Sequence, residues 1–453
     1  MDRSRSQGAQ PSAAPQSFLQ CLQYFLTPQV WKQAQQATRR RGRCRWQTRP
    51  LLFVLLAMTW CSGDSLPERF ETAKALYVAS YQRRRRPGKT FPGFQKALAK
   101  LPMPVLRAVA YAVRRRLAQV FAGRWMVDGF IPMGCDGSRL TCPRSAEFEQ
   151  RLGGDHNEHS PPTVWVTALV HLSSGLPWSW RLGKGTASER DHLRHLLPTL
   201  PPSTLLVADA GYVGYELLEG LLATPVSFLI RLSSKAPLYA SERLAWSRVR
   251  EGLVYYWPQW VQQENRKPIP VRLLRIRGRK VDVWLITNVL DAERLPRKTA
   301  GKFYRWRWRN EGLFRTYKRT LQKVKLMSRT VAMVHREAEG SLLAVQLLLA
   351  QGALALPTTS AVPIGMPSAR KVLLELRVEI RNVVGMYLGP RQQQTYWERL
   401  LQARWQQRRQ SSNKVRRPWP ARKDHKPPGP PTILKMGTDL KDKLENTLGK
   451  LCG

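Results

Sequence analysis

One short stretch of the chain carries four side chains of the types that phosphate chemistry uses. Tyr304, Arg307, Glu311 and Lys318 lie in YRWRWRNEGLFRTYKRTLQKVK, residues 304–325, which has no proline and one glycine. The stretch is therefore predicted to be one helix, and at about 100° per residue the four side chains would share an arc of roughly 60°. Such a face could bind a metal ion and hold a phosphate. A solvated ion-pair face is the alternative interpretation of the same charges.

Two further carboxylates follow apolar runs earlier in the chain. Asp136 lies in IPMGCDGSRL, and Asp209 ends TLLVAD. A buried strand that ends in a carboxylate delivers a charge to the edge of a sheet, where an active site can form. Asp128 is a rival for Asp136, but it follows a short helical end rather than a strand-like run. Asp209 could also be an ordinary turn residue before Gly211.

The spacing around Glu311 resembles a known signature. Tyr304, two residues, Arg307, three residues, Glu311, six residues and Lys318 follow each other as in the Tyr-Arg-Glu-Lys signature of DDE transposases from bacterial insertion sequences, in the insertion-sequence-four family. Asp209 begins Asp-Ala-Gly-Tyr, similar to the family's motif around its second aspartate. The resemblance covers about residues 129–352.

The resemblance implies an assignment for each acid. Asp136, Asp209 and Glu311 would be the catalytic residues and would bind two Mg²⁺ ions, for which Mn²⁺ may substitute. Hard oxygen ligands suit Mg²⁺, and two such ions can activate the attacking oxygen and stabilise the leaving oxygen of a phosphodiester. The surplus of cations in the chain is expected to keep these acids ionised. One departure from relatives is Asn310, which stands where they often have an apolar residue.

DNA contacts are implied for the remaining signature residues. Tyr304, Arg307 and Lys318 would bind the phosphate backbone, Arg307 through a bidentate grip and Lys318 through a point charge. Trp284, in VDVWLITN, stands where relatives place a tryptophan that stacks on a base flipped out of the DNA. Packing on the buried face of a hairpin is an equally good interpretation of Trp284.

Elements of α/β type are expected around these residues, in the order β-β-β-α-β-α-β followed by the helix that carries Glu311. This order is the RNase H-like layout, with a β-rich insertion at about 233–290 before the last catalytic helix and helical regions at both ends of the chain. The expected strands are 131–140, 163–172, 178–182, 204–209 and 226–232, the helices are 187–200 and 215–223, and a hairpin is formed by 271–277 and 280–287.

From the element patterns, the basic runs and the resemblance, we expect four regions along the chain. Residues 1–122 form a helical DNA-binding region with a disordered start at 1–16, and two basic runs, 39–49 and 83–89, suit phosphate contacts there. A solvated basic surface is the alternative interpretation of these runs. Residues 123–355 form the RNase H-like catalytic domain, 356–405 a C-terminal helical region, and 406–453 a basic, proline-rich tail.

The net charge limits the class of partner. Lys and Arg exceed Asp and Glu by 44, and such a surplus calls for a polyanion such as nucleic acid. Neither a secretory signal nor an apolar run of the ~20 residues that span a bilayer is found. The expected location is cytoplasmic and nucleoid-associated, with no membrane contact. A ribosomal-type protein is the other interpretation of the charge, but 16 tryptophans argue for large folded cores.

The function implied by the resemblance is cut-and-paste excision and insertion of a mobile element, with double-stranded DNA as element end and target and a homodimer in the DNA complex. An RNase H-like nuclease or resolvase without strand transfer is the first alternative. An inactive DNA-binding transposase derivative is the second, and the intact set of acids argues against it.

Overall fold

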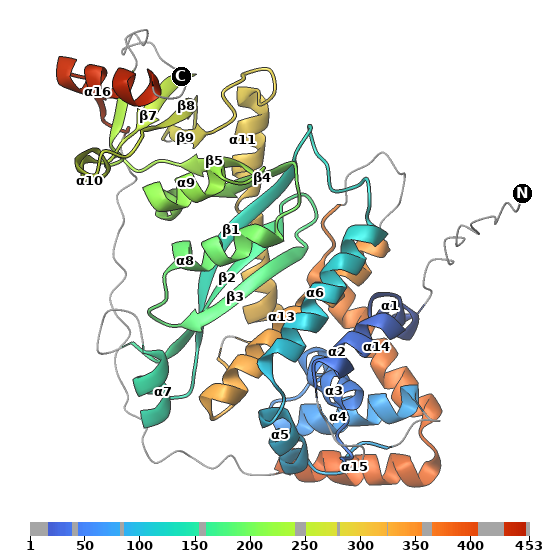
Figure 1. Ribbon diagram of the computed structural model, residues 1–453. Coiled ribbons are helices and arrows are strands. Elements are labelled where there is room, and N and C mark those ends of the chain that lie inside the picture. The colour runs from blue at the N-terminus through green and yellow to red at the C-terminus, as the bar shows by residue number, and fades with distance from the viewer. Residues whose placement is uncertain are drawn as a thin grey trace, which may run out of the picture. The chain divides into compact units, whose positions relative to one another are not determined.

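Two compact units make up the part of the chain that the structure describes. The computed structural model describes residues 17–38, 44–81, 86–153, 160–240, 251–278, 281–323, 325–355, 365–405 and 430–449 (Figure 1). A helical unit contains residues 1–120, 347–357 and 368–405, and a sheet unit contains 121–346, 358–367 and 406–453. The expected disordered start, parts of both basic runs and most of the predicted tail lie outside the described residues.

The helical unit begins with six helices, and side chains cap the starts of four of them. Ser17, Thr27, Ser65 and Thr90 each accept a hydrogen bond from a backbone N–H of the first helical turn, as N-cap residues do. No helix in the described residues is both long and apolar enough to cross a membrane. The six are α1 (Phe18–Phe25), α2 (Pro28–Gln36), α3 (Thr48–Trp60), α4 (Leu66–Ser80), α5 (Phe91–Ala99) and α6 (Met103–Val120).

Two helices from late in the chain complete this unit. The helices α14 (Ala369–Tyr387) and α15 (Pro390–Trp405) pack against α4. The guanidinium of Arg377 donates to the carbonyl of Trp60 at 2.9 Å, and the hydroxyls of Thr72 and Tyr396 lie 3.2 Å apart. The region predicted at 356–405 therefore has its described helices built into the same core as the N-terminal helices.

A ten-stranded sheet in the described residues forms the second unit. Its order is β10-β6-β7-β8-β9-β5-β4-β1-β2-β3. The strands β1, β4 and β5 are parallel, and β2 is antiparallel to both of its neighbours, β1 and β3. The strands are β1 (Ile131–Thr141), β2 (Thr163–His171), β3 (Pro177–Lys184), β4 (Thr204–Ala208), β5 (Ser227–Arg231), β6 (Leu238–Ala240), β7 (Glu251–Tyr256), β8 (Ile269–Ile276), β9 (Val283–Thr287) and β10 (Ile433–Lys435). The five strands and the hairpin expected from sequence are present, with the hairpin's turn residues 279–280 outside the described part.

Helices cover the sheet and carry the signature. The helices of this unit are α7 (Ala146–Leu152), α8 (Glu189–Leu196), α9 (Tyr215–Leu222), α10 (Gln259–Gln263), α11 (Arg297–Trp306), α12 (Arg309–Arg315), the first part of α13 (Val331–Leu354) and α16 (Thr438–Gly449). Phe303 and Tyr304 of α11 are buried in one cluster with Val207 of β4, Leu229 of β5 and Leu285 of β9. The α11 helix is therefore anchored across the centre of the sheet.

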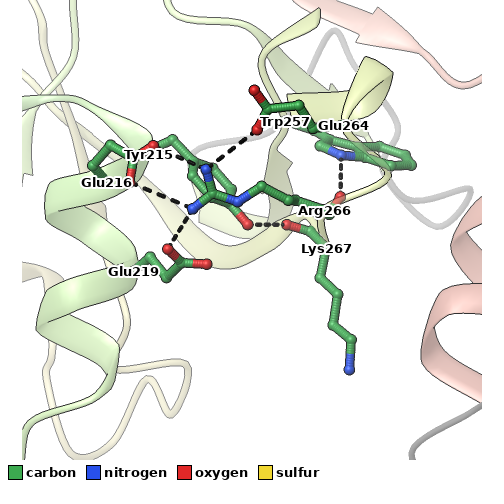
Figure 2. A network of polar contacts seen from close by, with 7 residues as sticks. All are labelled: Tyr215, Glu216, Glu219, Trp257, Glu264, Arg266 and Lys267. Carbon is green, nitrogen blue, oxygen red and sulfur yellow. Dashed lines mark hydrogen bonds and ion pairs between the residues drawn. The ribbon is translucent and has the colours of Figure 1, made fainter. Parts of the chain in front are cut away.

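A polar clamp joins the β-rich insertion to α9. Figure 2 shows the guanidinium of Arg266 between the carboxylates of Glu216 and Glu219, at 2.9 Å and 2.5 Å. The same guanidinium lies 4.5 Å from the ring centroid of Tyr215, whose hydroxyl donates to the carbonyl of Lys267 at 2.7 Å. Since α9 follows directly after the Asp209 turn, this clamp fixes the insertion to the element next to a candidate catalytic residue.

The helix predicted over 304–325 is interrupted. The α11 helix ends at Trp306, α12 spans 309–315, and residues 316–320 form a π-helical turn. The N–H of Arg307 is shared between the carbonyls of Phe303 and Tyr304, and the N–H of Asn310 donates to the carbonyl of Arg307 at 3.0 Å. These three-residue spacings tighten the backbone, so the four signature residues do not share one helical face.

The side chain of Asn310 packs α12 against Gly134 of β1. This side chain is fully buried, and a Cβ added to Gly134 would lie 2.4 Å from its amide nitrogen and 2.5 Å from its amide oxygen. Glycine at position 134 therefore leaves the space that Asn310 fills. Neither amide atom of Asn310 has a hydrogen-bond partner among the described residues. A buried polar group without a partner destabilises a fold by about 1–3 kcal/mol.

Replacing this amide should stabilise the sheet unit. We expect Asn310→Leu, which keeps the branched shape and removes the unsatisfied groups, to raise the free energy of unfolding by about 1–3 kcal/mol. Asn310→Asp, of equal size but charged, should lower it. Urea denaturation of both variants measures the difference. A loss of stability in the leucine variant would mean that the amide has a partner, such as a buried water.

Candidate active site

The strand register places the first two acids next to each other. Gly134 of β1 pairs with Val207 of β4 in the last pair of the parallel ladder. Asp136 and Asp209 each lie two residues beyond that pair, and side chains two residues apart in a strand share a face. Asp136 lies within β1, not near its end as expected from sequence, because β1 continues to Thr141 in its pairing with β2.

Asp209 is held by the signature residues. Its carboxylate lies 3.6 Å from the guanidinium of Arg307 and 3.6 Å from that of Arg231, at the end of β5. The hydroxyl of Tyr304 donates to the same carboxylate at 3.4 Å, and the N–H of Ala210 donates at 2.9 Å. The structure thus brings two residues of the signature to the second acid.

Arg307 is the most buried cation of this group. Only 5% of the residue is exposed, and its guanidinium carbon lies 4.8 Å from the ring centroid of Trp308. A buried charge is stable only when it is paired, and Asp209 supplies that charge. Trp308 itself is 58% exposed.

Asp136 is partly withdrawn from solvent. Its carboxylate accepts a hydrogen bond from the N–H of Gly137 at 2.9 Å. Burial raises the pKa of Asp136, and the negative charges of Glu311 and Asp209 raise it further, while the Gly137 N–H and Arg307 lower it. Loss of water around the carboxylate is the largest effect on the pKa of Asp136, and it outweighs the opposing effect of Arg307.

Glu311 lies in the first turn of α12 and is exposed. Its charge acts on Asp136, so the three acids predicted from sequence share one electrostatic neighbourhood. Within the described ranges, however, no three acid, histidine or cysteine side chains are close enough to hold a metal ion together. The carboxylate of Asp209 instead faces the guanidinium groups of Arg231 and Arg307.

Lys318 reaches the strand that carries Asp136. Its ammonium donates to the hydroxyl of Ser138 at 2.8 Å, and burial lowers the pKa of Lys318. Ser138 lies two residues beyond Asp136 on β1, so both side chains point to the same side of the strand. The π-helical turn at 316–320 provides this position for Lys318.

Trp284 and Asp128, which were considered as site residues from the sequence, are not among the residues that contact Asp209 or Asp136. Trp284 pairs with Arg275 across the hairpin, with the guanidinium carbon 5.6 Å from its ring centroid, and it is partly exposed. Its neighbour Leu285 belongs to the cluster under α11, so the ring of Trp284 points to the opposite face of the sheet. Asp128 lies in a turn with a φ of 47° and pairs with Lys302 at 2.9 Å.

Sequence reasoning missed two charged residues at the site. Arg231 could have been found from the sequence, because it ends β5, the strand that pairs with β4 and runs parallel to it. Glu189, the first residue of α8, has no comparable signal; a Cβ added to Gly137 would lie 2.5 Å from its carboxylate oxygen. Burial raises the pKa of Glu189, and the charge of Asp136 raises it further. Glu189 is therefore a fourth carboxylate beside the first acid.

The carboxylate oxygens of the three acids suit a divalent cation, although in this structure the three side chains are not close enough together to bind one. Asp136, Asp209 and Glu311 offer hard oxygen ligands, and a cation between them would offset the repulsion that raises the pKa of Asp136. Binding would require Asp209 to give up at least one of its arginine partners.

Comparison with known proteins agrees with this geometry. Residues 135–347 match the family described as transposase DDE domain, a range that contains all three acids and the whole signature. Over 233 residues the chain is 26% identical to the transposase InsG for insertion sequence element IS4 of Escherichia coli (strain K12). That alignment covers 49% of this chain and 52% of the relative, so the chain spans about half the length of the curated relative it matches.

One solved structure shows a weak similarity to this chain. The cryo-EM structure of the piggyBac transposase synaptic complex with hairpin DNA aligns over 87% of each chain with 12% identity and a TM-score of 0.43. This likeness is too weak to support an argument. The sequence matches suffice: residues 135–347 belong to the transposase DDE domain family, and the chain that carries them is related to the DDE transposases of the insertion-sequence-four family.

Proposed function

We propose that this protein is a DNA transposase that excises and inserts its own mobile element by metal-dependent phosphodiester hydrolysis and strand transfer. The observation that carries the proposal is the contact of Tyr304 and Arg307 with Asp209, beside Asp136 on the neighbouring strand. Two residues of the signature that the sequence predicted to serve one site thus contact the same carboxylate, that of Asp209. The match to the transposase DDE domain supports the same activity.

An RNase H-like core is the fold that we propose for this chemistry. In its support, the order β3-β2-β1-β4-β5 with β2 antiparallel to its neighbours follows the layout expected from sequence. The strands β6 to β9 would then be the insertion at about 233–290, attached through the Arg266 clamp. The region 1–122 would bind the element ends.

The residues of the site would divide the work as follows. Asp136, Asp209 and Glu311 would hold two Mg²⁺ ions, which activate an attacking oxygen and stabilise a leaving oxygen. Arg307 would move from Asp209 to a DNA phosphate, which keeps the buried guanidinium paired. Lys318 would hold the phosphate near β1 by its charge, and Arg231 would remain with Asp209.

Double-stranded DNA would be the substrate both as element end and as target, and a homodimer would bring two ends together. We place this activity in the cytoplasm, in association with the nucleoid. A nuclease or resolvase would cut the same ends without joining them, and an inactive derivative would only bind them. Terminal inverted repeats around the coding region would favour the transposase.

Removal of each acid should abolish cleavage but not binding. We expect Asp136→Ala, Asp209→Ala and Glu311→Ala each to lose Mg²⁺-dependent nicking of a supercoiled plasmid that carries the gene with its flanking sequence. Band-shift assays should show nearly unchanged DNA affinity. Asp128→Ala is the matched control and should nick normally. Normal nicking by the Asp136 variant, with loss in the Asp128 variant, would reverse the choice of first acid.

The raised pKa of Asp136 predicts a stability effect without DNA. A carboxyl whose pKa is higher in the folded state than its unfolded value of about 3.9 destabilises the fold increasingly as pH rises through that range. Asp136→Asn should therefore raise the melting temperature of the metal-free protein at pH 7 but not at pH 3. Mg²⁺ should raise the melting temperature of the wild type more than that of the variant. Equal melting temperatures at pH 7 would show that Asp136 is not destabilised by burial.

The stacking role implied for Trp284 can be separated from packing. Base–aromatic stacking is worth about 1–3 kcal/mol, and a flipped base needs such a platform. We expect Trp284→Ala to nick normally and to accumulate nicked ends, because only the bent second-strand step needs the stack. Trp308→Ala is the control, as Trp308 is the exposed tryptophan beside Arg307.

The two variants give distinct outcomes. Accumulation of nicked ends in the Trp308 variant alone would move the stacking platform to α12. Loss of all steps together with solubility in the Trp284 variant would make Trp284 a packing residue.

A further inference from the structure

A cationic cleft lies within the helical unit, apart from the acids of the sheet unit. It has a volume of about 580 Å³ and is lined by residues that precede α3, by α4, by the segment that leads into α5, and by α15. Its cations are Arg45, Lys74, Arg86, Lys89, Arg391 and Arg399, and Glu71 is the one carboxylate among the described lining residues.

The cleft joins the two basic runs predicted to contact DNA with a helix that the sequence placed in another region. Arg45 comes from the first run, Arg86 and Lys89 from the second, and Arg391 and Arg399 from α15. In the sequence, the two arginines of α15 lie more than 300 positions from the residues of the two basic runs. The packing of α15 against α4 is what collects their charges in one place.

Backbone contacts fix the position of the inner cations. The carbonyl of Lys89 accepts hydrogen bonds from the ammonium of Lys74 at 3.1 Å and from the guanidinium of Arg399 at 3.2 Å. Lys74 also forms an ion pair with Glu71. Burial lowers the pKa of Lys74, Glu71 raises it, and the charge of Arg399 lowers it.

The outer cations are free to meet a ligand from solvent. Arg45, Arg86, Lys89 and Arg391 are exposed, and they come from three different segments around the opening. Four charges spread in this way do not converge on one small anion. They match a row of phosphates, in which each cation meets its own anionic group.

We propose that this cleft binds the phosphate backbone of double-stranded DNA, and that α15 is part of the DNA-binding surface together with the N-terminal helices. The inference rests on the proposed function for the identity of the DNA, namely the element end. It goes beyond that function in assigning a site far along the chain from the predicted DNA-binding region 1–122.

The test measures DNA affinity of the full chain against salt concentration. The variant Arg45→Gln/Arg391→Gln removes one exposed cation from each side of the cleft. Lys371→Gln/Arg381→Gln is the matched control, because both residues are exposed on α14, lie outside the cleft and remove the same charge. Fluorescence anisotropy with a duplex oligonucleotide gives the slope of log affinity against log salt.

Each phosphate contact contributes about 0.9 to this slope. We expect the cleft variant to lower the slope by roughly 2 and to bind at least about tenfold more weakly at 0.1 M salt. The control should leave the slope nearly unchanged. Equal effects of the two variants would overturn the proposal, because the cleft would then contribute no more than general surface charge.

A second variant guards against misfolding. Lys89→Gln keeps the backbone carbonyl that Lys74 and Arg399 contact, and should lower the slope by about 1; melting curves of all variants should match the wild type. Tight binding of inorganic phosphate in calorimetry, with the DNA slope unchanged in every variant, would instead identify a small-anion site and refute the proposal. Nicking by the wild type is scored separately, so a protein that binds through the cleft but never nicks fails only the proposed transposase activity.

Discussion

The pairing of buried Arg307 with Asp209 is the interaction on which the site depends. Arg307 sits at the break between α11 and α12, and its charge can remain in that position only with an anion beside it. Asp209 is that anion, and it lies at the end of β4 in the centre of the sheet. One ion pair therefore sets the distance between the signature segment and the strands that carry the other acid.

In the proposed function, this pairing would make the site responsive to a DNA phosphate. A phosphate group that approaches Arg307 could replace Asp209 as its partner at little cost, because the guanidinium would exchange one anionic partner for another. The released carboxylate then faces Asp136 and Glu311, where like charges already raise the pKa of Asp136. Arrival of an anion and binding of cations would in this way favour each other.

The sequence predicted the strands well because their patterns are local. Apolar runs such as 163–172 and 204–209 are short, lie between turn residues, and form β2 and β4 nearly as expected. Asp136 and Asp209 were found because both follow such runs. Glu189 was not found, because its proximity to Asp136 arises from the packing of α8 over Gly137, a contact between segments about 50 residues apart. The assignment of α15 to the helical unit depends on tertiary packing in the same way.

The interrupted helix gives the signature spacing a different meaning from the one that periodicity suggested. A straight helix would align the four side chains on one face, in contact with one strand. In the structure Tyr304 and Arg307 reach Asp209 after β4, while Lys318 reaches Ser138 on β1. The tightened turn after Trp306 and the π-helical turn at 316–320 rotate these groups relative to each other. Glu311 lies between them on α12, which packs on β1 through Asn310. The segment thus contacts two neighbouring strands at once, and the interruptions of the helix allow it to do so.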